Sequence, residues 1–449
     1  MKRLFKPLVF IFLAAASLYA APATAQNTRN ITLKEVIDLS IKNNKELKYN
    51  KAQILEAIAA TKEAMERKLP DVKVSGSLMA LNNPHINLKT GGKDTSNGSG
   101  SKAQAVKVNQ IAYGLVNVSL PIYAGLRIQY GIESAQYLEK AISLDAENNK
   151  EEVILNSVNA FSNLYKARKA EEVVKESLAQ ARARAVDFAN LEKNGLLARN
   201  DYLKAELQAS NIELSLLETE KNRRVATSNL DIMLGLPQTT DLVADSASLM
   251  MPTDTKNIDE WEQLALQNRK DVEALSYREK AARTAIKATK GEMYPSLALT
   301  GGYVALYVPN LVTVVNAVNI GVGVQYNLGS LWKTRSKIQQ AEARVQQVQA
   351  NQEMLGDGIR MQVTQDYENY MYNTKKIDVY QKAIEQAAEN YRITKNKYDN
   401  ALVTTTDLLD AEVSQLQAKL NAAVAKADAA VSYQKLLQTT GTLVAQSNK

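Results

Sequence analysis

The chain has 449 residues, a formal net charge of +7 and 45% hydrophobic residues, with one histidine and no cysteine. Without cysteine it has no disulfide, no thiol nucleophile and no cysteine-based metal site. The lone His85 excludes zinc motifs and catalytic devices that need two histidines. Basic residues alternate with acidic ones, so no concentrated stripe indicates nucleic-acid binding. We therefore expect no catalytic residue, no cofactor, no metal and no nucleic-acid partner; the sequence does not predict an enzyme.

The first 25 residues have the three parts of a cleavable secretory signal. Three basic residues precede a mostly apolar run over 8–18, and Ala23-Thr24-Ala25 forms an A-x-A cleavage site. The apolar run is shorter than the about 20 residues that a membrane-spanning helix needs. We predict that residues 1–25 are a signal peptide. No later stretch is apolar enough for a spanning helix, so a membrane crossing would have to use strands.

The rest of the chain contains an internal repeat. Residues 33–47 align with residues 258–272 at an offset of 225, and from the second predicted strand onward the halves align at an offset of 206. The difference, 225 − 206 = 19 residues, falls in the polar stretch 82–104, where an exposed loop tolerates insertion. We predict a first repeat at 26–235, a linker or equatorial segment at 236–257, a second repeat at 258–441 and a C-terminal tail at 442–449.

The first repeat starts with a helix and continues into strands and long helices. Val116, Val118, Leu120 and Ile122 alternate with other residues as in a strand. From Arg127 to Lys193 there is no proline and only one glycine, and at 1.5 Å per residue such a helix is roughly 100 Å long. We predict a β-hairpin at about 71–122, a long helix at 127–193 and a second helix at 200–234.

The second repeat has the same layout and the clearest strand. Residues 318–328 place Val, Ile, Tyr and Leu on one face and Asn, Gly and Gln on the other, as in strands of transmembrane barrels. Tyr123, Tyr294 and Trp332 lie near strand ends, where an aromatic girdle is expected. We predict a β-hairpin at about 296–328, a long helix at 333–398 and a helix at 405–440, whose apolar residues, spaced by three and four, include Leu409, Val413 and Leu416.

Four strands cannot close a barrel, and an open sheet edge in lipid leaves costly unpaired backbone groups. The smallest spanning barrels have about eight strands and are filled by their own side chains. We therefore expect the chain to associate with more than one further copy. The alternative of a soluble β-sandwich is less favoured, because no other β segment is available for these hairpins to pack against.

Three fragments in this order resemble the TolC-like outer-membrane efflux protein family: VNVSLPIYAGLR, EKNGLLARNDYLKAE and YDNALVTTTDLLDAE. The resemblance extends from Ile31 to Gly441. It implies a mainly α fold with a small β part, in which the duplicated long helices form an α-helical barrel. The four transmembrane strands of each chain would contribute to a trimeric 12-stranded barrel in the outer membrane.

The resemblance also implies function, localisation and partners. The chain would be the outer-membrane channel subunit of a tripartite efflux system of a Gram-negative bacterium, with a large periplasmic portion, exporting small molecules. Its partners would be two further copies, a periplasmic adaptor (membrane fusion) protein, an inner-membrane RND or ABC transporter, and outer-membrane lipid. Type I secretion of proteins or peptides stays open, as does a soluble periplasmic coiled-coil scaffold.

Two aspartates are candidates for the selectivity of such a channel. Asp407 and Asp410 are three residues apart on a predicted helix and so face the same side. Threefold symmetry would turn each into a ring of carboxylates, which biases a pore toward cations, and the family has acidic rings at this constriction. The alternative is that both are ordinary carboxylates on a solvated helix face.

Other residues at the helix turns match the periplasmic entrance of the family. Asp201 and Tyr398 match positions that hold the entrance closed, but Val403 stands where their arginine partner is expected. Arg199, on the neighbouring turn, could substitute for it. The adaptor-contacting tip would comprise Gly195, Leu196, Ala401 and Leu402, for which ordinary helix-turn packing is the alternative.

Overall fold

A computed structural model describes residues 28–82, 84, 108–245 and 256–443. The predicted signal peptide, His85, linker residues 246–255 and tail residues 444–449 lie outside these ranges. The chain divides into two compact units, and each takes segments from both halves of the sequence. One unit comprises residues 1–49, 147–270 and 356–449, and the other comprises residues 50–146 and 271–355.

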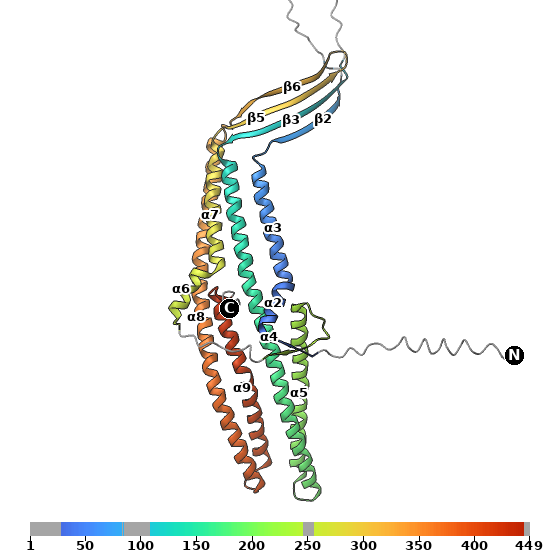
Figure 1. Cartoon of the computed structure of the whole chain (residues 1–449), viewed down its shortest axis with the longest axis vertical. Helices are drawn as coiled ribbons and strands as arrows, with labels where there is room; N and C mark the ends of the chain where they lie inside the picture. The colour runs from blue at the N-terminus through green and yellow to red at the C-terminus, as the bar shows by residue number, and fades with distance from the viewer. Residues whose placement is uncertain (1–27, 83, 85–107, 246–255, 444–449) are drawn as a thin grey trace, which may run out of the picture. The chain divides into compact units, whose positions relative to one another are not determined.

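The second unit contains a four-stranded antiparallel sheet in the order β2-β3-β5-β6 (Figure 1). Its register pairs Leu120 with Leu299 and Leu299 with Val322, so the alternating apolar residues of neighbouring strands share one face. The large apolar side chains at the two edges of this apolar face are exposed, with Val74 at 78% and Ile320 at 82%. The strands are β2 Asp71–Ala80, β3 Gln110–Ala124, β5 Ser296–Val308 and β6 Val312–Gln325.

A β-bulge changes the direction of one aromatic side chain near the end of β3. The pairing of β3 with β5 shifts between Pro121 and Tyr123, which places Tyr123 opposite Leu297. Because a bulge inserts one unpaired residue, it moves the following side chain to the other face. Tyr123 thereby joins the apolar face at its end.

Helices join the sheet at a crowded junction in the same unit. A Cβ added to Gly125, whose φ is +62°, would lie 2.2 Å from the carbonyl oxygen of Gly291, so this approach of two backbones requires glycine. Below it, Ser134 donates a hydrogen bond to the carbonyl of Ala281 at 3.1 Å. The helices here are α3 Lys45–Glu66, α7 Lys270–Lys290 and the adjoining parts of α4 Arg127–Lys193 and α8 Ser330–Asp399.

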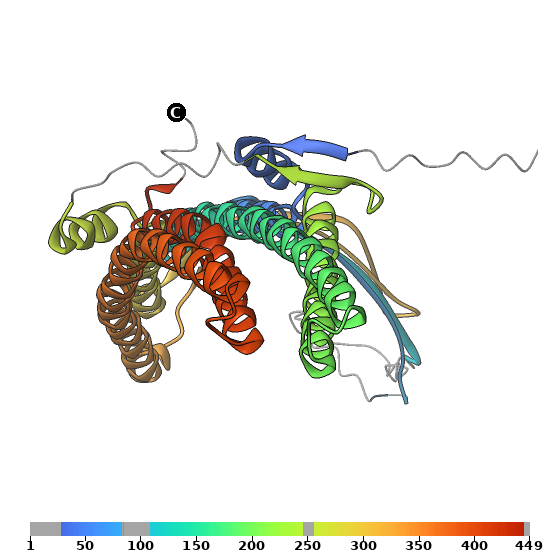
Figure 2. The same ribbon diagram turned by 90° about the horizontal axis from the view of Figure 1, so that it is seen from below.

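The first unit contains a small parallel sheet and most of the remaining helices. Strand β1 (Thr28–Ile31) pairs with β4 (Asp241–Ala244), and both lie beside α2 (Leu33–Asn43) in Figure 2. Phe161, Leu164, Leu230 and Leu242 are among the fully buried residues of the core beneath this sheet. The other helices are α5 Arg199–Leu234, α6 Ile258–Asn268, α9 Thr405–Thr439 and the remaining parts of α4 and α8.

Two long helical hairpins dominate the first unit, α4 with α5 and α8 with α9, and their turns lie at the same end of it (Figure 1). Leu416 and Leu420 of α9 pack on a core formed by Leu178 of α4 and Ile212 of α5, among others. Helix α9 therefore contacts both helices of the other hairpin. Among the described residues, no helix combines the length and the apolar character needed to cross a membrane.

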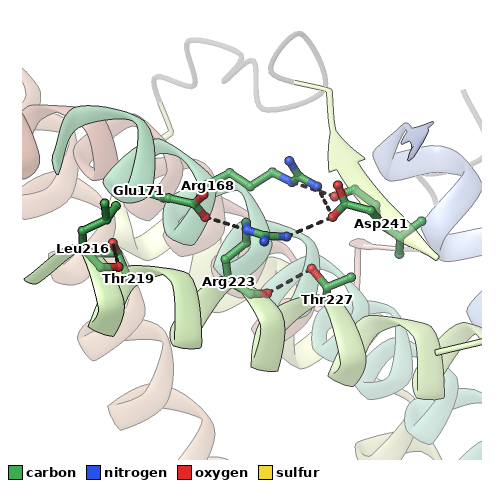
Figure 3. A network of polar contacts seen from close by, with 8 residues as sticks. Arg168, Glu171, Leu216, Thr219, Arg223, Thr227 and Asp241 are labelled. Atoms are coloured by element: carbon green, nitrogen blue, oxygen red, sulfur yellow. Dashed lines mark hydrogen bonds and ion pairs between the residues drawn. The ribbon is translucent and has the colours of Figure 1, made fainter. Parts of the chain in front are cut away.

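A polar network ties β4 to α4 and α5 (Figure 3). The guanidinium of Arg223 donates to Glu171 at 2.6 Å and to Asp241 at 3.0 Å. Arg168 donates to the same Asp241 oxygen at 2.5 Å and to the carbonyl of Leu242 at 2.7 Å. Two arginines thus share one carboxylate, which fixes the short strand on the helices.

One buried carboxyl in this unit has no compensating contact. Asp231 of α5 is fully buried, and neither of its carboxyl oxygens has a hydrogen-bond partner among the described residues. Burial, and secondarily the charge of Asp241, raise the pKa of Asp231 to about 6 from its ordinary 3.8. The ionised form of this side chain therefore destabilises the folded protein at neutral pH.

We expect Asp231→Asn to be stabilising at pH 8 by about 1 to 3 kcal/mol. Because the folded pKa lies above the unfolded one, the wild-type protein loses stability as pH rises from about 4 to 6. The difference in stability between variant and wild type should therefore disappear toward pH 4. Thermal unfolding of the purified protein at a series of pH values measures this difference. Glu218→Gln, at a largely exposed position of the same helix, is the matched control; an equal pH-dependent gap in that variant would contradict the assignment.

Candidate functional site at the hairpin turns

The turn between α4 and α5 ends the first helix with a Schellman motif. Gly195 adopts a left-handed conformation with φ +71°. The amide of Leu196 donates to the carbonyl of Leu191 at 2.9 Å, and the amide of Gly195 donates to that of Glu192 at 2.9 Å. The backbone turns sharply here, and the side chain of Leu196 is left 75% exposed.

The turn between α8 and α9 has the same geometry with a less suitable residue. Ala401 occupies the left-handed position with φ +58°. The amides of Ala401 and Leu402 donate to the carbonyls of Tyr398 and Lys397, each at 2.8 Å. Leu402 is 72% exposed, like its counterpart Leu196. Because a Cβ disfavours the left-handed region, this second turn carries backbone strain that glycine avoids in the first.

The N-termini of α5 and α9 also differ, and here the second hairpin has the more favourable residues. Helix α9 begins with a capping box, in which the Thr404 amide donates to Asp407 Oδ2 at 2.8 Å and the Asp407 amide donates to Thr404 Oγ1 at 3.3 Å. The Thr404 hydroxyl also donates to Asp407 Oδ2 at 2.6 Å, and these hydrogen bonds lower the pKa of Asp407. Helix α5 begins after Ala198, which makes no side-chain capping bond.

The two candidate selectivity residues both lie exposed in the first turns of α9. Asp407 is the carboxylate of the capping box, so its position is fixed by the backbone at the helix start. Asp410 follows one turn later on the same side of the helix. The capping role was missing from the sequence reasoning, although Thr404-x-x-Asp407 carries the signal for it.

Arg199 lies close to a carboxylate of its own hairpin. Its guanidinium is 3.7 Å from Glu192, and its side chain is largely exposed. Asp201 instead pairs with Lys204 at 3.3 Å, and the same Lys204 ammonium donates to the hydroxyl of Thr406 on α9 at 3.2 Å. Lys204 therefore links the turn of one hairpin to the start of α9.

Tyr398 lies in an aromatic contact between the hairpins. Its ring stacks on that of Phe188 from α4, with centroids 5.6 Å apart, and its hydroxyl oxygen accepts a hydrogen bond from Thr405 at 3.4 Å. Phe188, Ala205 and Leu408 form the buried centre of this contact. The tip of the first unit is thus a packed cluster with residues from all four helices.

The most buried charges near the turns come from residues that sequence reasoning missed. The guanidinium of Arg184 on α4 donates to Glu412 Oε2 on α9 and to the hydroxyl of Tyr391 on α8. Burial raises the pKa of the Glu412 carboxyl, and the charge of Arg184 opposes that effect. A partial signal was available, because Glu412 lies between Leu409 and Leu416 of the predicted apolar stripe.

The site offers surfaces and charges rather than reactive chemistry. Among the described residues, no group of three or more histidine or carboxylate side chains is arranged to hold a metal ion. What the turns present instead are the exposed Leu196 and Leu402, a pair of carboxylates at the start of α9 and a packed contact between hairpins. Such a site can bind a partner surface and influence ions that pass it.

The two turns should respond oppositely to exchange of their left-handed residue. We expect Ala401→Gly to raise the stability by roughly 0.5 to 1 kcal/mol, the relieved strain exceeding the added chain entropy. Gly195→Ala should lower it by about 1 to 2 kcal/mol through backbone strain alone, since no atom lies within 4 Å of the added Cβ. Thermal unfolding of the purified chain measures both, and shifts of the same sign would refute the interpretation.

The helix caps provide a second reciprocal pair. Thr404→Ala removes the capping hydroxyl and should cost about 1 kcal/mol, whereas Ala198→Thr, which can complete a box with Asp201, should stabilise the chain. The depressed pKa of Asp407 contributes stability above its ordinary 3.8, which is lost as pH falls through the folded value. The deficit of Thr404→Ala should therefore shrink in acid, which a thermal-unfolding series across pH would reveal. An unchanged midpoint at neutral pH would contradict the capping role.

Comparisons with known proteins agree on one class. Residues 261–442 match the family "Outer membrane efflux protein", whereas no curated protein matches the sequence significantly. Among solved structures, VceC of Vibrio cholerae is 17% identical with a TM-score of 0.72, covering 91% of this chain and 96% of that one. The CmeC outer membrane channel of Campylobacter jejuni is 18% identical with a TM-score of 0.74, covering 92% and 86%.

The MtrE outer membrane channel of Neisseria gonorrhoeae, solved in its open state, is 17% identical with a TM-score of 0.69, covering 92% of this chain and 89% of that one. At such identities the structural likeness establishes the fold, and the family match lies in the second half of the chain. Residues 261–442 of the chain are thus similar to the outer membrane efflux protein family, and the chain has the fold of these outer-membrane channels.

Proposed function

We propose that this chain is the outer-membrane channel subunit of a tripartite efflux system. Three copies form a channel-tunnel that exports small molecules in complex with a periplasmic adaptor protein and an inner-membrane RND or ABC transporter. The sheet spans the outer membrane, and the helical hairpins lie in the periplasm. The observation that carries the proposal is the four-stranded sheet, which is incomplete in a single chain.

The apolar face of the sheet supports its placement in lipid. Its edge strands expose valine and isoleucine side chains to the surroundings. In water this face would be a large unprotected apolar patch, whereas lipid tails solvate it. The bulge places Tyr123 on the apolar face, and Trp332 and Tyr294 are exposed. Tyrosine and tryptophan are the residues enriched at the membrane–water interface. Among the exposed apolar residues of β2 and β6 are Val72, Val74, Leu78, Val315, Val318, Ile320, Val322 and Val324.

The edges of the sheet support assembly. Strands β2 and β6 each pair on one side only among the described residues. In lipid their outer backbone groups need partners, which a second copy supplies by pairing its β2 with β6. Three copies provide 3 × 4 = 12 strands, enough for a barrel with an open lumen.

Apolar stripes on the hairpins support the same assembly. On α5, Leu207, Leu214 and Leu217 are more than half exposed, and on α8 Met361 and Val379 are too. The three leucines of α5 are spaced by seven and three residues, which suits helices that pack side by side against another copy. Burying these stripes removes an apolar surface that a periplasmic monomer would leave in water.

The hairpin turns form the periplasmic entrance in this proposal. The exposed side chains of Leu196 and Leu402 provide an apolar contact surface for the adaptor. Gly195 and Ala401 shape the turns that carry these side chains. Asp407 and Asp410 of three copies form two rings of carboxylates near that end. Asp201 is joined to the second hairpin through Lys204, and Tyr398 packs on Phe188.

Fractionation separates this proposal from a soluble periplasmic scaffold. Expressed with its signal, the protein should be recovered with the outer membrane as a trimer; recovery in the soluble periplasm would refute the channel. Deletion of its gene should raise sensitivity to small toxic molecules. Retention of a secreted protein, with unchanged drug sensitivity, would instead indicate type I secretion.

The carboxylate rings predict a measurable selectivity. Purified trimer in a planar bilayer should conduct with a preference for cations, and Asp407→Asn combined with Asp410→Asn should reduce that preference, because six carboxylates per trimer are neutralised. Glu218→Gln, at an exposed position of α5, serves as the control with one charge removed elsewhere. Unchanged reversal potentials in the double variant would show that the two aspartates do not line the pore.

A further inference from the structure

A cavity of about 470 Å³ lies in the second unit, where the strands meet the helices. Strand residues and the adjoining ends of α3 and α4 line it, so a single compact unit builds the whole wall. Its volume falls in the range of roughly 300 to 1,000 Å³ that is usual for pockets that bind small molecules. The cavity is separate from the hairpin turns, which belong to the other unit.

Part of the cavity wall comes from the polar face of the sheet. Ser296 pairs with Gln325, and along their strands both alternate with residues of the apolar face, Leu297 and Val324. Ser119 alternates in the same way with its neighbours in β3. All three polar residues line the cavity. In the proposed channel the apolar face is turned to lipid, so this part of the wall faces the lumen.

The charged side chains that line the cavity are both arginines, and no carboxylate is among the lining residues. Arg127 Nε donates to the carbonyl of Ala124 at 3.1 Å, which holds the guanidinium in place. Its terminal nitrogens have no further partner among the described residues. Arg67 contacts Glu63 at 3.5 Å, but both side chains are largely exposed, so that pair contributes little. The cavity therefore carries uncompensated positive charge.

The groups around this charge suit an anionic oxygen ligand. The carboxylate that the register places beside Ser119 belongs to Asp71, and Lys73 already engages it at 2.7 Å. Arginine binds carboxylate, sulfonate and phosphate oxygens through parallel N–H donors. The hydroxyl of Ser119 and the amide of Gln325 are further possible donors. Pro121 and Ile128 add apolar surface to the same wall.

A glycine in the interior of α4 keeps part of the cavity wall free of side chains. Gly131 lines the cavity and is the only glycine between Arg127 and Lys193. Glycine is unfavourable in a helix interior relative to alanine. A Cβ added at this position would meet no atom within 4 Å, so no packing contact requires glycine. A larger side chain here would project into the open space of the cavity.

We propose that this cavity binds an exported organic anion, a molecule with a carboxylate or another anionic oxygen group on an apolar body. Arg67 and Arg127 bind the anionic oxygens. Pro121 and Ile128 contact the apolar part, for which Gly131 leaves room. The inference rests on the proposed channel function and names a class of cargo for it. It is separate from the cation preference proposed for the entrance, which concerns ions that pass the hairpin turns.

The first test compares two probes of nearly the same shape, the anion 2-naphthoate and the neutral 2-naphthamide. Isothermal titration calorimetry of the purified protein in nanodiscs of zwitterionic lipid should show about tenfold or more tighter binding of naphthoate. Arg67→Gln combined with Arg127→Gln should remove this difference by weakening naphthoate binding. Equal affinities of the wild type for the two probes would overturn the proposal, as would unchanged naphthoate affinity in the double variant.

The matched control removes two arginines elsewhere in the same unit. Arg283 and Arg335 are exposed and do not line the cavity. Arg283→Gln combined with Arg335→Gln should therefore bind naphthoate like the wild type. An equal loss of naphthoate affinity in this control would show that only the overall charge matters, and would overturn the assignment to the cavity.

A further variant fills the cavity without changing its charge. Gly131→Leu places a side chain in the open space, and folding should be retained because leucine favours a helix over glycine. Its thermal unfolding midpoint should equal or exceed that of the wild type, while its naphthoate affinity falls by about tenfold or more. Retained naphthoate affinity in this variant would overturn the assignment to the cavity.

Lipid headgroups carry the same anionic chemistry, and the nanodisc composition separates the two sources. Replacing about half of the zwitterionic lipid by phosphatidylglycerol should leave the naphthoate affinity of the wild type unchanged, because the proposed site faces the lumen. A severalfold loss of that affinity would show that a lipid headgroup competes for the cavity, and would overturn an exported ligand.

The last test places the site in the conduction path. In planar bilayers naphthoate should lower the single-channel current of the wild type but not that of Gly131→Leu or of the double arginine variant. Binding without any effect on the current would overturn a role in export while leaving the channel function intact. A wild-type protein that does not conduct would overturn the channel function itself, whereas the calorimetry would still decide whether the cavity binds anions.

Discussion

The backbone hydrogen bonds at the two edges of the four-stranded sheet are the constraint on which the rest of this molecule depends. Strands β2 and β6 carry rows of amide and carbonyl groups that a single chain leaves without partners in the sheet. Water could satisfy them, but the apolar face between them is unsuited to water. Lipid around the face and another strand at each edge satisfy both requirements, and this is the assembly that we propose.

Both compact units depend on the duplication of the sequence. Each repeat supplies one strand hairpin and one helix hairpin, and both compact units draw on both repeats. The joining contacts between repeats therefore decide the geometry of each unit: β3 with β5 in the sheet, and α9 with α4 and α5 in the hairpins. The repeats also differ at their turns, where the left-handed position holds Gly195 in the first repeat and Ala401 in the second.

Features that depend on residues close together in the sequence could be predicted, whereas contacts between residues far apart in the sequence could not. The mainly α fold with a small β part was predicted and is confirmed, as is the resemblance of residues 261–442 to outer-membrane efflux proteins. Period-two alternation and a glycine at a helix end are local patterns. The strand at Val318 to Val324 and the turn at Gly195 could therefore be predicted. The Arg184–Glu412 contact joins residues 228 positions apart and leaves no periodic trace. Neither Asp410 nor the turn leucines can be assigned a partner from one chain, so their roles stay predictions.

The unequal caps of the two turns imply that the two hairpins are not equally firm at the end that we propose as the entrance. In the α8–α9 hairpin, Thr404 caps the start of α9, whereas Ala401 strains the backbone after the end of α8. In the α4–α5 hairpin, Gly195 lets α4 end without strain, whereas Ala198 leaves the start of α5 without a side-chain cap. Fraying, which begins at the weakest helix terminus, is thus directed into the last turn of α8 in one hairpin and the first turn of α5 in the other. In the proposed trimer these soft segments would alternate with firm ones. The proposed adaptor would then meet two kinds of surface at every subunit, one that keeps its conformation and one that changes it on contact.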